Sequence, residues 1–86
     1  MNNIKKIVNH YGEEAQAHKA IEELNELAVA IAHQDKEAII EEMADVYIMM
    51  EQLKEFKFFD YDKFTDTVVY KMERQIERIK EEIANE

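Results

Sequence analysis

The chain has 86 residues, which is enough for one small domain spanning residues 1–86 and too few for two. It contains no cysteine, which excludes disulfide bonds and thiolate metal sites and leaves a hard metal ion or oligomerisation to support so small a core. A formal charge of −9 argues against a partner with an anionic surface, so we expect neither nucleic acid nor membrane binding.

The apolar runs of the chain are short. The longest hold about six residues, whereas a bilayer-spanning helix needs about 20. No signal peptide is visible at the start of the chain. We therefore expect a soluble protein of the cytoplasm.

The composition predicts an all-α fold, because proline is absent, glycine occurs once, and helix-favouring residues are abundant. Gly12 is expected to end the first helix in the αL conformation. Asp35 is expected to cap the third helix after a short break at Gln34. The expected helices cover about Asn3 to His10, Glu13 to His33, Lys36 to Phe56 and Lys63 to Asn85.

Apolar residues at helical spacing support these helices and predict a partner chain. In the second helix, one apolar face holds Ile21, Leu24, Leu27, Ala28 and Ile31. In the last helix, a narrow seam suited to one partner helix holds Val69, Met72, Ile76, Ile79 and Ile83. The second and third helices are apolar nearly all round beyond their acidic turns, and such helices must be enclosed. We therefore expect a small helical bundle completed by homo-oligomerisation, as a homodimer or a homotetramer.

Two acidic pairs interrupt the apolar helices. Glu23 and Glu26 are three residues apart, as are Glu42 and Asp45, so each pair shares one helix face. The short break before Asp35 predicts an antiparallel hairpin, with the pairs about ten residues before it and about nine after it. At about 1.5 Å per residue, the two pairs lie within roughly 3 Å of the same height. Four carboxylates are therefore expected to converge.

Four carboxylates at that separation repel one another unless a cation is present, and their oxygens suit Mg²⁺, Mn²⁺ or Ca²⁺. Mg²⁺ commonly takes further oxygens from phosphates, which indicates a phosphorylated substrate. The alternative is that these glutamates form ordinary solvated helix faces. A metal site is favoured because Asp45 lies mid-helix among apolar residues, and because the stripe with Glu22 continues into Val29 and Ala30.

Other kinds of site lack their signatures in this chain. There is no EF-hand loop with its central glycine, and no pair of Glu-x-x-His motifs of the kind found in di-iron bundles. The three histidines form no ligand pattern, and no glycine-rich phosphate loop is present. Phosphate binding would thus depend on a metal ion and basic side chains.

A Glu-Glu-x-x-Glu group at residues 22–26 is followed by Glu-x-x-Asp at residues 42–45. Through these two motifs the chain resembles, over residues 11 to 80, the MazG-like, all-α nucleoside triphosphate pyrophosphohydrolases. Gln16 and Lys19 precede the first group, and Lys71-Met72-Glu73-Arg74 is similar to the family's basic motif on the final helix. The chain departs from some relatives at Gln75, where they have a second arginine, and at Gln52, where they have an asparagine.

This resemblance implies Mg²⁺-dependent hydrolysis of an NTP or dNTP to the monophosphate and pyrophosphate. It assigns the metal ligands to Glu23, Glu26, Glu42 and Asp45. It makes Glu22 and Glu41 supporting residues that orient ligands or the attacking water. It assigns phosphate contacts to Lys19, Lys71 and Arg74, the last two supplied across a subunit interface.

Two alternatives remain open. The first belongs to another functional class: a non-catalytic helical interaction module, in which the seam of the last helix recruits a partner and the acidic turns bind a structural cation. The second is an enzyme of related chemistry, phosphoribosyl-ATP pyrophosphatase. The preferred base and sugar cannot be assigned from the residue pattern.

Overall fold

The computed structural model describes residues 2–86, which form four α-helices and no strand. In chain order the helices are α1 (Asn3–Tyr11), α2 (Glu13–Ala32), α3 (Lys36–Leu53) and α4 (Tyr61–Ala84). The predicted all-α fold is confirmed, and the observed helix ends differ from the expected ones by three residues at most. Within residues 2–86, no helix has the combination of length and apolarity that crossing a membrane requires.

Side-chain caps fix the starts of three helices. Asn2, Asp35 and Asp60 each accept a hydrogen bond from the backbone N–H three residues further on, at 2.8, 3.2 and 3.0 Å. These bonds satisfy N–H groups that have no partner within the helix. The expected cap at Asp35 is confirmed, and Asp60 starts α4 two residues earlier than expected.

The two tight turns use different backbone conformations. Gly12 has φ 90° and ψ 159°, so the expected αL conformation is wrong there, although the positive φ still favours glycine. Gln34 has φ 56° and ends α2, while the N–H of Asp35 donates to the carbonyl of Ala30 at 3.3 Å. This bond pattern is that of a Schellman turn, and it reverses the chain within a few residues.

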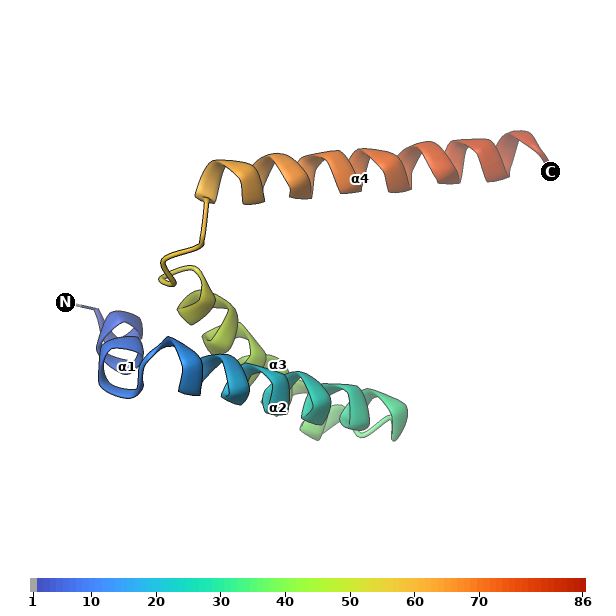
Figure 1. Ribbon diagram of the computed structural model, residues 1–86. Helices are drawn as coiled ribbons and strands as arrows, with labels where there is room; N and C mark the ends of the chain where they lie inside the picture. The colour runs from blue at the N-terminus through green and yellow to red at the C-terminus, as the bar shows by residue number, and fades with distance from the viewer. Residues whose placement is uncertain (1) are drawn as a thin grey trace.

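Helices α2 and α3 form an antiparallel hairpin, and α1 packs against both (Figure 1). The backbone N–H of Lys57 donates to Glu13 Oε2 at 2.9 Å, which ties the loop after α3 to the start of α2. The core of these three helices is small. Its buried apolar side chains are Val8, Ala20, Ala30, Met49 and Phe56.

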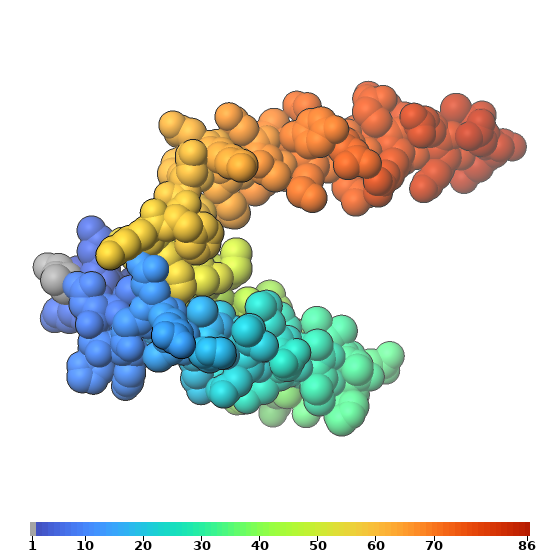
Figure 2. Space-filling view, in the orientation of Figure 1, coloured from blue at the N-terminus to red at the C-terminus, as the bar shows by residue number. Residues whose placement is uncertain are grey.

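Helix α4 extends away from the other three helices (Figures 1 and 2). Across residues 2–86 it packs against no other helix, and none of its side chains is buried. The radius of gyration is 16.8 Å, whereas a compact chain of this length has about 12 Å. The residues of the predicted seam are all about half exposed or more: Val69, Met72, Ile76, Ile79 and Ile83.

Large apolar side chains also lie on the outer surfaces of the hairpin. Ile21 and Ile31 on α2 are 57% and 55% exposed, and Ile40 on α3 is 69% exposed. The predicted second helix is present as α2, but no described element covers the apolar face that was expected to be enclosed. The surfaces that meet between α2 and α3 instead carry several polar side chains.

A buried amide pair links α2 to α3. Gln16 Nε2 donates to Gln52 Oε1 at 2.7 Å, and Gln52 Nε2 lies 3.5 Å from the sulfur of Met49. Gln52 is 2% exposed, less than any other residue described as buried. Its hydrogen bond to Gln16 joins two positions that each lie seven residues from an acidic residue of the same helix: Gln16 from Glu23, and Gln52 from Asp45. The pair therefore holds the register of the hairpin that carries these acids.

Replacing Gln52 by leucine is expected to lower the free energy of unfolding by about 1–3 kcal/mol, because the buried amide of Gln16 loses its partner. The double variant Gln16→Leu/Gln52→Leu should be less unstable than the sum of the single variants, because no buried amide is left unpaired. Urea denaturation at one fixed protein concentration measures both effects. If the double variant loses as much unfolding free energy as the two single variants together, the Gln16 and Gln52 side chains are not energetically coupled.

Candidate metal centre

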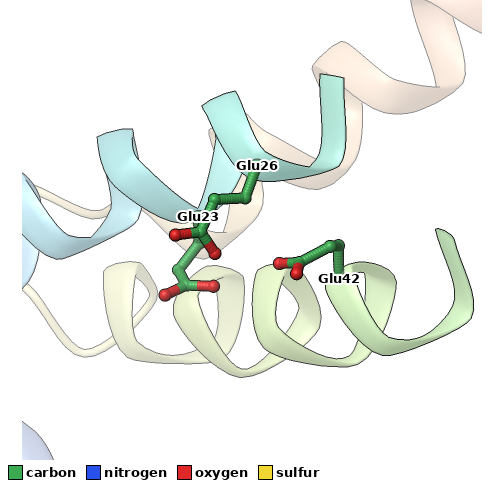
Figure 3. A group of neighbouring side chains, drawn as sticks. All are labelled: Glu23, Glu26 and Glu42. Atoms are coloured by element: carbon green, nitrogen blue, oxygen red, sulfur yellow. The ribbon is translucent and has the colours of Figure 1, made fainter. Parts of the chain in front are cut away.

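Three carboxylates meet between α2 and α3 (Figure 3). Glu23 and Glu26 project from α2 and Glu42 from α3, and each offers an oxygen within 4.8 Å of the others. The spacing of three residues places the two α2 acids on one face, and the short turn brings α3 alongside. The convergence expected from sequence is thus seen for these three acids.

Glu23 is the buried member of the group, with 6% of its surface exposed. Its Oε1 lies 3.3 Å from Lys19 Nζ, one helical turn earlier, while its Oε2 is buried without a hydrogen-bond partner. Lys19 also lies 3.6 Å from Glu22, and the pKa of Lys19 is raised, chiefly by its hydrogen bond to Glu23. One oxygen of Glu23 is thus neutralised by a lysine, and the other remains free for a cation.

Glu42 lies in a similar environment on α3. It is half-buried, and its Oε2 is shielded from solvent without a hydrogen-bond partner. Burial raises the pKa of the Glu42 carboxyl above its ordinary value, and the neighbouring carboxyls of Glu26, Asp45 and Glu23 raise it further. Each of these effects penalises the ionised form of Glu42, so the protein without a cation stores electrostatic repulsion here.

The donors fit a hard divalent cation. Carboxylate oxygens are the ligands that Mg²⁺ and Mn²⁺ take, and a cation would supply the partner that the buried oxygens of Glu23 and Glu42 lack. It would also offset the repulsion that raises the pKa of Glu42. The acidic cluster is therefore a chemically suitable metal centre.

The raised pKa of Glu42 predicts a pH-dependent stability in the metal-free protein. The fold binds the Glu42 proton more tightly than the unfolded chain does, so stability falls as pH rises from about 4.5 through the raised pKa. Glu42→Gln removes this contribution, so its urea midpoint should be higher than that of wild type near neutral pH, and the two midpoints should converge in acid. Urea midpoints in EDTA between about pH 4 and pH 8 measure this difference. A difference that does not change with pH would contradict it.

The other predicted acids lie around this group. Asp45 is exposed and outside the three converging carboxylates, but its charge contributes to the raised pKa of Glu42, so it lies nearby. Glu22 is exposed and pairs with Lys19. Glu41 is exposed on α3, beside Glu42 in sequence. The roles suggested for these residues stay predictions.

Two predicted basic residues lie away from the cluster. Lys71 and Arg74 are exposed on α4, which does not pack on the hairpin in the described part of the chain. The Arg74 guanidinium stands 5.8 Å from the centre of the Tyr70 ring, on the same helix. The described chain therefore brings Lys19, but neither Lys71 nor Arg74, to the carboxylates.

The contacts of some residues in this region could not be predicted from the sequence. The hydrogen bond between Gln16 and Gln52 joins positions 36 residues apart, and glutamines on helices usually face solvent. Asn25 and His33 line a pocket beside the cluster, although neither belongs to a recognisable motif. Only the spatial arrangement of the hairpin shows that these residues belong near the site.

One of three comparisons with known proteins gives a match. The model of one protein family, described as the MazG nucleotide pyrophosphohydrolase domain, matches residues 12–80. The match covers most of the chain and includes the carboxylates of the hairpin and the basic residues of α4. Comparisons with curated proteins and with solved structures gave no match.

Proposed function

The chain belongs to the MazG nucleotide pyrophosphohydrolase family, and we propose that it hydrolyses a nucleoside triphosphate to the monophosphate and pyrophosphate with Mg²⁺. The observation that carries this proposal is the cluster of Glu23, Glu26 and Glu42, with two buried oxygens that lack partners. Mn²⁺ is a chemically similar substitute. In this proposal residues 1–86 form one domain.

Glu23, Glu26 and Glu42 would hold the metal, and Asp45 would join them from the same side of α3. Bound Mg²⁺ supplies charge neutralisation at the triphosphate and lowers the pKa of coordinated water. Glu22 and Glu41 would help to orient the ligands or would accept a hydrogen bond from the attacking water. The carboxylates thus set both the charge and the geometry of the reacting centre.

In the proposed reaction, a water oxygen forms a bond to the α-phosphorus. The bond between this phosphorus and the oxygen bridging to the β-phosphorus breaks, and that oxygen leaves with pyrophosphate. The proton lost by the water goes to a carboxylate of the site. Lys19 Nζ lies 3.3 Å from Glu23 Oε1, and in this proposal it would donate hydrogen bonds to the phosphates.

Lys71 and Arg74 would reach the same phosphates from a partner subunit. Within one subunit α4 packs on no helix, while its seam and the outer surfaces of the hairpin expose many large apolar side chains. Exposed apolar patches of this kind mark protein interfaces. A homodimer, or a homotetramer built from it, would cover these surfaces and bring α4 to the hairpin of a second copy.

The test of this function is pyrophosphate release from a panel of NTPs and dNTPs with Mg²⁺. Release with at least one nucleotide and its loss in EDTA are expected, together with a strong reduction in Asp45→Asn. Failure of every nucleotide to release pyrophosphate would refute the enzyme, whereas full activity in Asp45→Asn would remove Asp45 from the metal site.

The exposed seam of α4 also favours a second function, a non-catalytic interaction module whose acidic turns bind a structural cation. Thermal melts with and without Mg²⁺ or Mn²⁺, together with the pyrophosphate-release assay, distinguish the interaction module from the enzyme. A large metal-induced rise in melting temperature without turnover would favour the module. Absence of any rise would argue against a metal site in either function.

A further inference from the structure

A pocket of about 380 Å³ opens between α2 and α3, on the turn side of the acidic cluster. Glu26 and Glu42 line this pocket and also belong to the cluster, so the two sites are continuous. Its volume falls within the range of about 300–1,000 Å³ typical of small-molecule sites. A ligand held at the carboxylates by one end would therefore extend into this pocket.

The pocket is apolar with a few polar groups. Val29, Ala30 and Ala38 provide apolar lining, and Asn25 and His33 supply an amide and an imidazole. Both side chains offer a hydrogen-bond donor and an acceptor when the histidine is neutral. Apolar walls with a small number of placed polar groups are the usual composition of a site that selects among similar ligands.

The charges in the pocket indicate which part of a nucleotide fits. Glu26 and Glu42 line it, and so does Asp35, so an anionic group would be repelled wherever a cation does not offset these charges. A nucleobase is flat, uncharged and largely apolar on its faces, with donors and acceptors at its edge. It matches the apolar lining, while its edge matches Asn25 and His33.

We propose that this pocket binds the nucleobase of the substrate, and that Asn25 and His33 determine which base is preferred. This proposal rests on the proposed function, because the phosphates must lie at the acidic cluster for the base to lie here. It further requires an enzyme that distinguishes bases rather than one that hydrolyses all nucleotides equally.

The test compares Asn25→Ala and His33→Ala with wild type across nucleotides that share a sugar and differ in base. Losing one hydrogen bond to the base should reduce preference for the best base over the others by about 10-fold in kcat/KM. His18→Ala is the matched control, because His18 is an exposed histidine of α2 that does not line the pocket. Its preference should equal that of wild type.

Equilibrium binding of nucleoside 5′-monophosphates with Mg²⁺ tests the pocket without turnover. Val29→Trp should fill the pocket from an exposed position and weaken monophosphate binding by about 10-fold or more, with inorganic pyrophosphate binding unchanged. Circular dichroism confirms that each variant keeps its helices.

The outcomes distinguish this proposal from the function it rests on. If wild type hydrolyses nucleotides and both alanine variants keep its base preference, the pocket assignment is wrong and the enzyme stands. If wild type hydrolyses no nucleotide, the proposed function fails. In that case monophosphate binding still tests whether the pocket holds a nucleobase. Equal affinity of wild type and Val29→Trp for the monophosphates would overturn the pocket assignment.

Discussion

The variant Glu42→Gln is expected to lose more than about 100-fold in kcat/KM for the preferred nucleoside triphosphate. Even residues that only hydrogen-bond to metal ligands commonly contribute about 10- to 100-fold to metal affinity or activity, and Glu42 is proposed as a ligand itself. The amide keeps the size of the side chain but removes its negative charge, and its NH₂ group cannot bind a cation. Pyrophosphate release under saturating Mg²⁺ measures the loss.

This loss should occur without unfolding. The same substitution relieves the repulsion that raises the pKa of Glu42, so the metal-free variant should be at least as stable as wild type near neutral pH. Glu37→Gln is the matched control, because it removes the same charge from an exposed position of α3. It should retain nearly full activity. Wild-type activity in Glu42→Gln would remove this residue from the site.

A second large effect is expected when two inactive variants are combined. Arg74→Ala should reduce activity by about 100-fold or more if its guanidinium stabilises charge on the phosphates. In a dimer whose sites take carboxylates from one subunit and α4 from the other, a mixed dimer of Glu42→Gln and Arg74→Ala has one intact site. Random assembly of equal amounts makes half of the dimers mixed, which should restore about a quarter of wild-type activity.

Co-expression of the two variants with different tags provides the mixed dimers for this measurement. The control is a mixture of Glu42→Gln with Glu23→Gln, which should stay inactive because every hairpin then carries one defect. Recovery only in the first mixture supports an α4 supplied by the partner subunit. If neither mixture recovers, although mixed dimers form, Arg74 does not act across the interface.

The sequence predicted the helices and the hairpin well because their signals are local. Asp35 caps α3 as expected, and the short turn places Glu23 and Glu42 opposite each other. Helical spacing alone brings residues three apart onto one face. The pairing of α2 with α3 could therefore be predicted from local signals in the sequence.

Other features depend on long-range packing or on local strain, and they were harder to predict. The Gln16–Gln52 bond joins positions 36 residues apart, and no periodic pattern marks a buried glutamine. Gln34 adopts φ 56° at the turn, where the usual signal would be glycine or asparagine. Asp45 has apolar neighbours on both sides in the sequence, but in the described chain it is exposed.

Helix α4 shows a further limit of sequence reasoning. Its alternating apolar seam predicts a helix that packs against one partner, and the helix is present. Within the described chain no helix covers Val69 or Ile76, and both stay exposed. The pattern thus describes a surface that needs a partner, while the identity of the partner is not written in the pattern.

Product identification is the most direct test of the proposal that the acidic cluster of Glu23, Glu26 and Glu42 carries out nucleotide pyrophosphohydrolysis. Wild type with Mg²⁺ and its best nucleoside triphosphate should yield equal amounts of monophosphate and pyrophosphate, resolved by chromatography or phosphorus NMR. Both products should disappear in EDTA and in Glu23→Gln. Formation of diphosphate and inorganic phosphate, or unchanged products from Glu23→Gln, would contradict the proposal.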